Sequence, residues 1–524
     1  IISELVRRVA IHVCYRKERR KRQKLLISEL SREYAKNTTL HGLRYVTEKL
    51  TVVEKLYWLY IFIACAVICT FLIRNIWVKW ITSPVIVTLN EQLVPVGDVP
   101  FPSVTICPQN KNRKSVYNFY ENYQKFAPLT QNPLLEKFED IGLICHGGLY
   151  NKYLNKILST IYKREISNSS VVEHILEVAP DVSNVFESCI FRERRMRCSS
   201  MFKKVLTSEG VCFNFNSLSA KEIFRTEKIQ REYQYLDRDT PSKQWSLEEG
   251  YSKESYTSLT FKTYPFRGKD NGAKPDFQIL LKEEESDQMC NSMNKGFKIY
   301  VQHPADMPQN SLYYYAALPN KTTSMAVKVK MLSTSPSLKG YTPEVRQCYF
   351  QIDKQLQYFR PYTASNCRLE CQSRYTYDEC KCVFFNMPHH NSYEICTQKQ
   401  RACVARALDV VITDKLANDS MRSDTESCRC LPACDSIQYD AEILKIDLDI
   451  ETELSKINKG RLDVGAYSFS KVEMYFKEHA FVSTRRSELF GNTDFLANCG
   501  GLLGLFHGFS FLSLVEIVYF VTLR

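Results

Sequence analysis

Residues 494–516 combine an apolar composition with a stripe of small and polar side chains. The 21 residues between Asp494 and Glu516 include no Asp, Glu, Lys or Arg, and this length is about enough to cross a bilayer as a helix. Steps of three or four residues keep side chains on one helical face. The stripe consists of Gly500, Gly504, Gly508, Ser510, Ser513 and Glu516. It fits either close helix packing or the lining of a pore.

The chemistry of a pore is favoured by the end of this stripe. A carboxylate such as Glu516 is costly against lipid and usually faces water or a partner. Gly508-Phe509-Ser510 can loosen a helix, because glycine has a wide backbone range and serine can bond freed carbonyls. Carbonyl and hydroxyl oxygens can replace the hydration shell of a cation. Helix packing remains the alternative for Gly500 and Gly504.

A second apolar run, residues 56–73, contains 18 uncharged residues and is followed by Arg74. Tyr57, Trp58, Trp77 and Trp80 flank it as interfacial aromatic residues do. Residues 1–55 carry 14 Lys or Arg against 6 acidic residues, so a net +8 of the chain's +12 precedes the run. This charge predicts a cytoplasmic N-terminus and attraction to anionic lipid, rather than binding of nucleic acid. Two spans then return the C-terminus to the cytoplasm, with the middle of the chain outside.

Sixteen of the twenty cysteines lie in this middle segment. A dense, even set is typical of an oxidised extracellular framework. The others are Cys14, Cys65, Cys69 and Cys499. Glycosylation sequons at Asn168, Asn320 and Asn418 agree with an extracellular location.

Ten cysteines are concentrated within residues 348–434. Cys367 and Cys371 are one helical turn apart, and Cys428, Cys430 and Cys434 could face them from an antiparallel partner, paired from the outside inward. Zinc is the competing use of close cysteines, although an extracellular setting favours disulfides. Ten cysteines allow about 945 pairings, and the spacing does not choose among them.

The elements between the two spans are predicted to be mixed. Alternating residues after Pro102 and at 277–281, 297–301 and 472–476 predict strands, which we expect to join in one sheet. Helical spacing within 116–185, as at Leu154, Ile157, Leu158 and Ile161, predicts helices. The charged stretch 222–254 is predicted to be an exposed insertion. The fold class is therefore a two-span membrane protein with a large, disulfide-rich α+β extracellular domain.

Several motifs resemble those of the degenerin/epithelial sodium channel family, and most of all its insect pickpocket branch. The resemblance extends over nearly the whole chain. Its motifs are LHGLRY (40–45), FPSVTICPQN (101–110), GVCFNFN (210–216), CRLECQSRY with CKCVFFNMP (within 367–388), CRCLPAC (428–434) and GGLLGLFHGFSFLSLVE (500–516).

The resemblance implies a homo- or heterotrimeric, sodium-preferring, voltage-independent channel blocked by amiloride-type compounds, in the plasma membrane. It implies a fist-like ectodomain of palm, β-ball, finger, knuckle and thumb. The implied disulfides are Cys348–Cys434, Cys367–Cys430, Cys371–Cys428, Cys380–Cys403, Cys382–Cys396, Cys107–Cys212 and Cys189–Cys198. Cys145 and Cys290 are the cysteines that then remain, and we expect them to pair.

The resemblance also implies site residues. Gly508, Phe509 and Ser510 fall on the selectivity motif for Na⁺, and Ala497 falls where bulky residues hold degenerins open. His41 and Gly42 match the gating His-Gly pair. Glu516 would add negative charge near the inner pore. Acid-sensing relatives carry a Tyr where Ser83 stands here, so the resemblance does not imply gating by protons. The stimulus stays open among protons, peptides, small ligands, mechanical load and constitutive opening.

The resulting domain prediction is a cytoplasmic segment (1–54), a first membrane helix (55–80), an extracellular domain (81–493, thumb about 348–434) and a pore-lining helix (494–524). A cytoplasmic tail is expected to follow outside this sequence. No GxSxG or HExxH motif is present, so neither catalysis nor a cofactor other than permeant Na⁺ is expected. The alternative function is a non-conducting or regulatory bitopic receptor subunit that needs a partner subunit.

Overall fold

The structure is a computed structural model of the 524-residue chain. It describes residues 29, 32–48, 50–82, 85–126, 133–145, 170–230, 245–252, 264–269, 274–284, 287, 290, 295–308, 313–413, 428–456, 466–489 and 491–522. These residues belong to two compact units. One consists of residues 1–86 with 487–524, and the other of residues 87–486.

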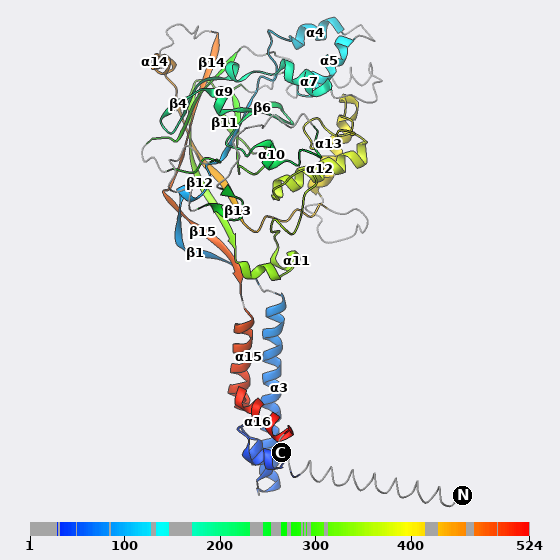
Figure 1. The fold of residues 1–524 in the computed structure, drawn as a ribbon, viewed down its shortest axis with the longest axis vertical. Coiled ribbons are helices and arrows are strands. Elements are labelled where there is room, and N and C mark those ends of the chain that lie inside the picture. The colour runs from blue at the N-terminus through cyan, green and yellow to red at the C-terminus, as the bar shows by residue number, and fades with distance from the viewer. Residues whose placement is uncertain are drawn as a thin grey trace, which may run out of the picture. The chain divides into compact units, whose positions relative to one another are not determined.

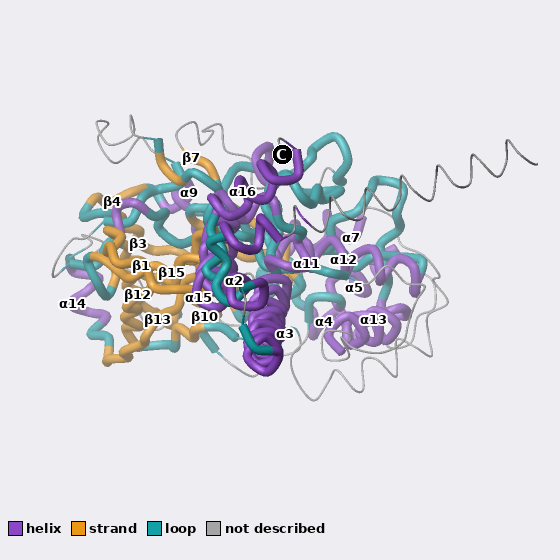
Figure 2. Tube along the Cα trace, turned by 90° about the horizontal axis from the view of Figure 1, so that it is seen from below, coloured by secondary structure: helices purple, strands orange, loops and turns teal. Residues whose placement is uncertain are grey.

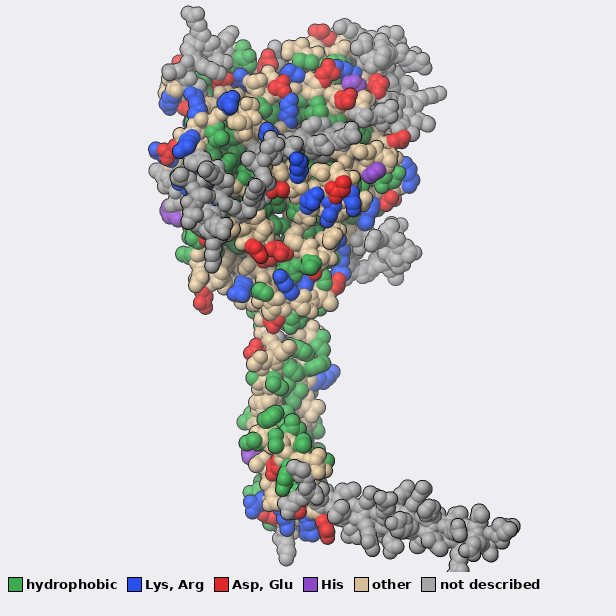
Figure 3. All heavy atoms as spheres, in the orientation of Figure 1, with side chains coloured by type: hydrophobic (Ala, Val, Ile, Leu, Met, Phe, Trp, Pro, Cys, Tyr) green, Lys and Arg blue, Asp and Glu red, His purple; other side chains and the backbone are tan. Residues whose placement is uncertain are grey.

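The first unit is helical (Figure 1). Helix α3, Val52–Thr82, has 31 residues and is the one described helix that alone is long and apolar enough to cross a membrane. Many of its apolar side chains are exposed, as lipid contact requires (Figure 3). It is preceded by helical residues 32–37 and by α2, Leu43–Thr47. Near the end of α3, Trp80 stacks on Phe495 with ring centroids 4.9 Å apart.

The second apolar segment is not one straight helix. It forms α15, Asn492–His507, and α16, Phe511–Thr522, which meet at an angle of 71°. The two helices pass the test for a membrane span only as a bent pair. The break falls on residues 508–510, where the sequence indicated a loosened helix.

An eight-stranded sheet dominates the second unit (Figure 1). The strand that follows α3 along the chain and the strand that precedes α15 are neighbours in this sheet. Its strands, in spatial order, are β1 Val85–Pro95, β15 Ala480–Glu488, β12 Lys321–Thr334, β14 Tyr467–Phe476, β9 Phe277–Glu284, β3 Phe186–Phe191 and β4 Arg194–Met196, while β13 Ser436–Asp447 pairs with β12.

A separate five-stranded sheet contains the other predicted strands. Its order is β11 Tyr315–Ala317, β10 Phe297–Gln302, β2 Ser103–Pro108, β6 Gly210–Phe215 and β5 Lys203–Thr207. The prediction of one sheet is therefore wrong, because alternation identifies a strand but not its partner. The two sheets share a phenylalanine-rich core that includes Phe101, Phe191, Phe213, Phe215 and Phe277. A short hairpin, β7 Trp245–Ser246 and β8 Gly250–Tyr251, is separate from both.

Helices cover the other side of this unit, away from the strands (Figure 2). The main ones are α4 Phe119–Phe126, α5 Pro133–Gly142, α7 Ser170–Val178, α12 Ala364–Cys380 and α13 Arg401–Thr413. Shorter helices are α8 Val182–Val185, α9 Cys198–Met201, α10 Ala220–Ile223, α11 Pro343–Arg346, α14 Ile450–Ser455 and the 3₁₀ turns Val96–Asp98, Pro336–Gly340 and Gln398–Gln400. The helical pattern at 154–161 lies outside the described residues.

The stretch 222–254 is not simply an exposed insertion. Its first part packs into the molecule, because Ile223, Phe224, Ile229 and Gln230 are buried. The high charge of this stretch concealed its apolar positions Ile223, Phe224 and Ile229.

Eight disulfides cross-link the second unit. Seven have the pairing that the family resemblance implies: Cys107–Cys212, Cys189–Cys198, Cys348–Cys434, Cys367–Cys430, Cys371–Cys428, Cys380–Cys403 and Cys382–Cys396. The eighth, Cys145–Cys290, joins the two cysteines that remained and were expected to pair. Three of them are nested and start at or before α12, with sequence separations of 86, 63 and 57 residues. Closing such long loops removes conformational freedom from the unfolded chain, so each typically stabilises the fold by about 2–4 kcal/mol.

Candidate pore site

The break between α15 and α16 begins at Gly508. This residue ends α15 in the left-handed region, with φ 67° and ψ 18°, a conformation that glycine adopts without steric cost. Its N–H donates to the carbonyl of Gly504 (2.8 Å), and the N–H of Phe509 donates to that of Leu503 (3.2 Å). The regular helical ladder therefore stops before Ser510.

Ser510 starts the next helix through reciprocal hydrogen bonds with Ser513. The N–H of Ser510 donates to Ser513 Oγ at 3.1 Å, and the N–H of Ser513 donates to Ser510 Oγ at 3.3 Å. Each serine thus satisfies a backbone donor that the start of a helix leaves unpaired. The exposed Ser510 and the fully buried Ser513 hold the break in one geometry.

The segment with the predicted His-Gly pair lies against this break. The N–H of His41 donates to the carbonyl of His507 at 2.9 Å. A Cβ placed on Gly508 would come within 2.9 Å of His41 ring atoms, so the ring occupies the space that a larger residue would need. Gly42 has φ 86°, and its Cα faces Phe62 of α3. The structure therefore brings His41 and Gly42 together with Gly508.

Thr39 adds a second contact between the same segments. Its hydroxyl lies 2.9 Å from that of Ser513 and donates to Glu516 Oε2 at 3.5 Å. The predicted pore carboxylate is therefore part of one polar group with the hydroxyls at the break. No sequence pattern indicates a role for Thr39, although it lies two residues before His41.

His507 was also missed as a site residue. It is buried, its carbonyl accepts the His41 N–H, and its ring meets the Phe62 ring edge-to-face at 5.1 Å. A histidine inside an apolar segment was the signal that could have identified it.

Ala497, Gly500 and Gly501 lie in the first three turns of α15. Ala497 is exposed, and a Cβ built on Gly500 or Gly501 meets no described atom within 4 Å. The alternative role of Gly500 in packing is therefore not realised against α3. These three residues are available to meet another chain.

Comparison with known proteins shows the family. A family model described as amiloride-sensitive sodium channel matches residues 34–520, which include both sides of the break and the His-Gly segment. The chain belongs to the amiloride-sensitive sodium channel family. Its family consists of membrane ion channels rather than enzymes.

Three relatives align with this chain over most of their own length. Pickpocket protein 28 of Drosophila melanogaster is 28% identical over 503 residues, which cover 94% of this chain and 78% of that protein. Sodium channel protein Nach of the same species is 22% identical, covering 93% and 86%. Acid-sensing ion channel 1A of Danio rerio is 22% identical, covering 92% and 86%. The predicted resemblance to the pickpocket branch is confirmed.

The remaining predictions concern Ser83 and the three glycosylation sequons. Ser83, Asn168 and Asn418 lie outside the described residues. Asn320 is exposed and has φ 56°, its N–H donates to the carbonyl of Phe469, and its own carbonyl accepts from Leu448. Its side chain remains a candidate for glycosylation.

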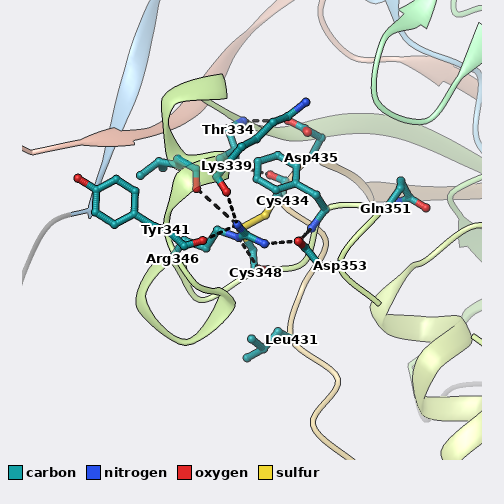
Figure 4. Close-up of a disulfide and its surroundings, with 12 residues drawn as sticks. Thr334, Lys339, Tyr341, Arg346, Cys348, Gln351, Asp353, Leu431, Cys434 and Asp435 are labelled. Carbon is teal, nitrogen blue, oxygen red and sulfur yellow. Dashed lines mark hydrogen bonds and ion pairs between the residues drawn. A yellow bond between two sulfur atoms is a disulfide. The ribbon is translucent and has the colours of Figure 1, made fainter. Parts of the chain in front are cut away.

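A buried arginine organises the base of the cysteine-rich segment (348–434) in this channel-family ectodomain. Arg346 is 2% exposed and donates to the carbonyls of Tyr341 (2.7 Å) and Cys348 (3.1 Å), and it pairs with Asp353 (Figure 4). It thereby holds a turn, a helix end and the Cys348–Cys434 disulfide in one cluster. Thr334, at the end of β12, joins this cluster through its hydroxyl, which donates to the carbonyl of Cys434.

Proposed function

We propose that this chain is a subunit of a sodium-preferring, voltage-independent cation channel of the plasma membrane that is blocked by amiloride. Membership of the amiloride-sensitive sodium channel family supports the channel class. In this proposal, three homologous or identical subunits surround the pore, and both termini are cytoplasmic. The extracellular domain controls opening.

The observation that carries the proposal is the broken second apolar segment beside the His-Gly pair. Continuous membrane helices use every backbone carbonyl internally, whereas irregular backbone is tolerated at membrane depth where it lines a water-filled cavity. Gly508, Phe509 and Ser510 form such a break, and its hydroxyls and freed carbonyls are oxygen ligands suited to a dehydrating cation. Three copies would form a polar ring there, with Glu516 supplying negative charge on the inner side.

Ala497 extends the proposal to gating. It lies on the same helix about three turns before the break, and it is exposed. A residue in this position can limit how closely neighbouring copies of α15 approach.

Voltage clamp of cells expressing the chain tests the proposal. We expect an inward Na⁺ current that amiloride reduces, with the chain alone or together with a related subunit. In Ser510→Val, the side chain loses its oxygen and becomes larger, so the Na⁺/K⁺ permeability ratio should fall several-fold or the current should disappear.

Thr70→Val is the matched control, because this hydroxyl lies in α3 and donates only to the carbonyl of Ala66 one turn earlier. Its permeability ratio should equal that of the wild type. An unchanged ratio in Ser510→Val would refute the assignment of the filter. Absence of amiloride-sensitive current at full surface expression with related subunits would refute the channel proposal itself.

A further inference from the structure

A cavity lined by tyrosines lies in the second unit, where the five-stranded sheet meets β13. Its volume is about 170 Å³. β10 contributes Tyr300 and Gln302, the chain around β11 contributes Tyr313 and Tyr315, and β13 contributes Tyr439 and Asp440. The rings of Tyr313, Tyr315 and Tyr439 and the carboxylate of Asp440 therefore border one small space, whereas the Tyr300 side chain belongs to the core on the opposite face of β10.

The hydroxyl groups of three of these tyrosines are already engaged. The hydroxyl of Tyr300 donates to Glu209 (3.1 Å), that of Tyr315 to Asp440 (3.1 Å) and that of Tyr439 to the carbonyl of Pro100 (2.7 Å). These bonds fix the orientation of the rings. What these tyrosines offer to an occupant is therefore mainly aromatic surface.

Two of the lining rings, that of the exposed Tyr313 and that of the buried Tyr315, meet edge to face. Tyr313 and Tyr315 have centroids 5.3 Å apart and planes inclined by 79°. The face of an aromatic ring carries partial negative charge, and several faces around one point attract an ammonium group. Aromatic cages for quaternary ammonium ions use this arrangement.

The negative charge of Asp440 at the cavity also favours a cation. Burial opposes ionisation of Asp440, but hydrogen bonds from Tyr315 and Lys330 outweigh it and hold the pKa of this carboxyl below its usual range. One ammonium group of the chain already lies here, because Lys330 Nζ is 3.4 Å from Asp440 Oδ2.

We propose that this cavity is a binding site for a small organic ammonium ion, held by the tyrosine rings and by the carboxylate of Asp440. A hard metal cation fits less well, because it prefers several oxygen ligands and the cavity offers one carboxylate. Lys330 is a competitor in this site, since its ammonium group partly neutralises Asp440. The proposal concerns binding outside the pore and does not depend on conduction.

Choline is a suitable probe, and 3,3-dimethylbutan-1-ol is its uncharged counterpart of the same shape. Binding to the purified full chain in detergent can be followed by saturation-transfer NMR of the methyl protons. We expect choline to bind and the alcohol to bind at least about tenfold more weakly, because only choline carries the charge. Equal binding of the two compounds, or no binding of choline, would overturn the proposal.

Two substitutions should move the Kd of choline in opposite directions. Asp440→Asn removes the counter-charge and should raise it about tenfold, whereas Lys330→Gln removes the competitor and should lower it about threefold. Lys330 and Asp440 are both substantially exposed, so these changes should leave the fold intact. An unchanged or raised Kd in Lys330→Gln would contradict the proposal.

A second ion pair on the same two strands provides the controls. Lys321 of β12 pairs with Asp447 of β13 at 2.5 Å, and neither residue borders the cavity. Lys321→Gln and Asp447→Asn should leave the Kd of choline unchanged. Tyr313→Phe keeps the ring and should bind choline as the wild type does, whereas Tyr313→Leu should bind choline several-fold more weakly. Equal binding of choline by both variants would exclude a role of this ring.

Discussion

At Gly508, a backbone requirement and a steric requirement coincide. The residue has φ 67°, and its Cα faces the His41 ring, which would lie 2.9 Å from an added Cβ. Gly508→Ala therefore introduces a left-handed alanine, at a cost of about 1–2 kcal/mol, together with a collision. We expect the His41–His507 hydrogen bond to be lost and whole-cell current at matched surface expression to fall at least several-fold.

Two further variants separate these causes. Asn tolerates a left-handed conformation but still carries a Cβ, so Gly508→Asn should lose current as Gly508→Ala does. Gly340→Ala is the control, because an added Cβ there meets no described atom within 4 Å, its φ is not positive, and the residue belongs to the other compact unit. Wild-type current and selectivity in Gly508→Ala would show that the contact with His41 has no role in conduction.

Among the elements, those defined by local spacing could be predicted from the sequence. The CxxxC spacing predicted that Cys367 and Cys371 share a face, and both lie in α12 and are bonded to the segment that ends at Cys434. Sheet membership could not be predicted, because the alternation at 104–106 and at 472–476 is the same although the strands belong to different sheets.

The candidate pore site likewise has features that could be predicted from the sequence and features that could not. Glycine and serine content predicted the break itself, since those residue types act locally. The contact of Thr39 with Ser513 joins residues 474 positions apart, and no local pattern encodes it. The family resemblance identified His41 and Gly42 as a gating pair, but the close approach of the His41 ring to Gly508 is visible only in three dimensions.

The turn Pro336–Gly340, the helix α11 and the Cys348–Cys434 disulfide depend on one side chain, that of Arg346. Breaking a buried ion pair from one side typically costs about 3–5 kcal/mol, because the partner groups remain without compensation. Arg346→Met should therefore increase hydrogen–deuterium exchange of the backbone between residues 334 and 353 and lower the thermal unfolding midpoint. Arg346→Lys should recover only part of this loss, because an ammonium group cannot reproduce the planar set of donors.

Arg429→Met is the matched control for this cluster. Arg429 pairs with Glu344 at 3.2 Å, but both side chains are about half exposed, and such surface pairs contribute about 0–1 kcal/mol. Its exchange and unfolding midpoint should stay close to those of the wild type. If Arg346→Met behaved in the same way, the buried guanidinium would not be what holds these elements together.

For the whole molecule, the connection between the two sheets includes a buried carboxyl group. Glu283, in β9, accepts a hydrogen bond from the N–H of Gly296 (2.9 Å), whose carbonyl accepts one from Gln109, just after β2. Burial raises the pKa of Glu283 to about 7, although the Gly296 N–H and the charge of Lys295 act in the opposite direction. The folded extracellular domain therefore favours the protonated form of this residue.

The consequence is a defined pH dependence of global stability. A carboxyl whose pKa is raised by folding stabilises the fold fully below the unfolded pKa of about 4.5, and this stabilisation is lost as pH rises through about 7. The shift corresponds to about 3 kcal/mol at full ionisation.

In Glu283→Gln, which stays neutral and can still accept the Gly296 N–H, the thermal unfolding midpoint should match the wild type near pH 5 and exceed it at pH 8. Glu284→Gln is the control, because Glu284 is an exposed neighbour on the same strand. Its thermal unfolding midpoint should equal that of the wild type at both pH values. A Glu283→Gln midpoint that fell below the wild type at pH 8 would mean that the ionised carboxylate, not the neutral acid, joins the two sheets.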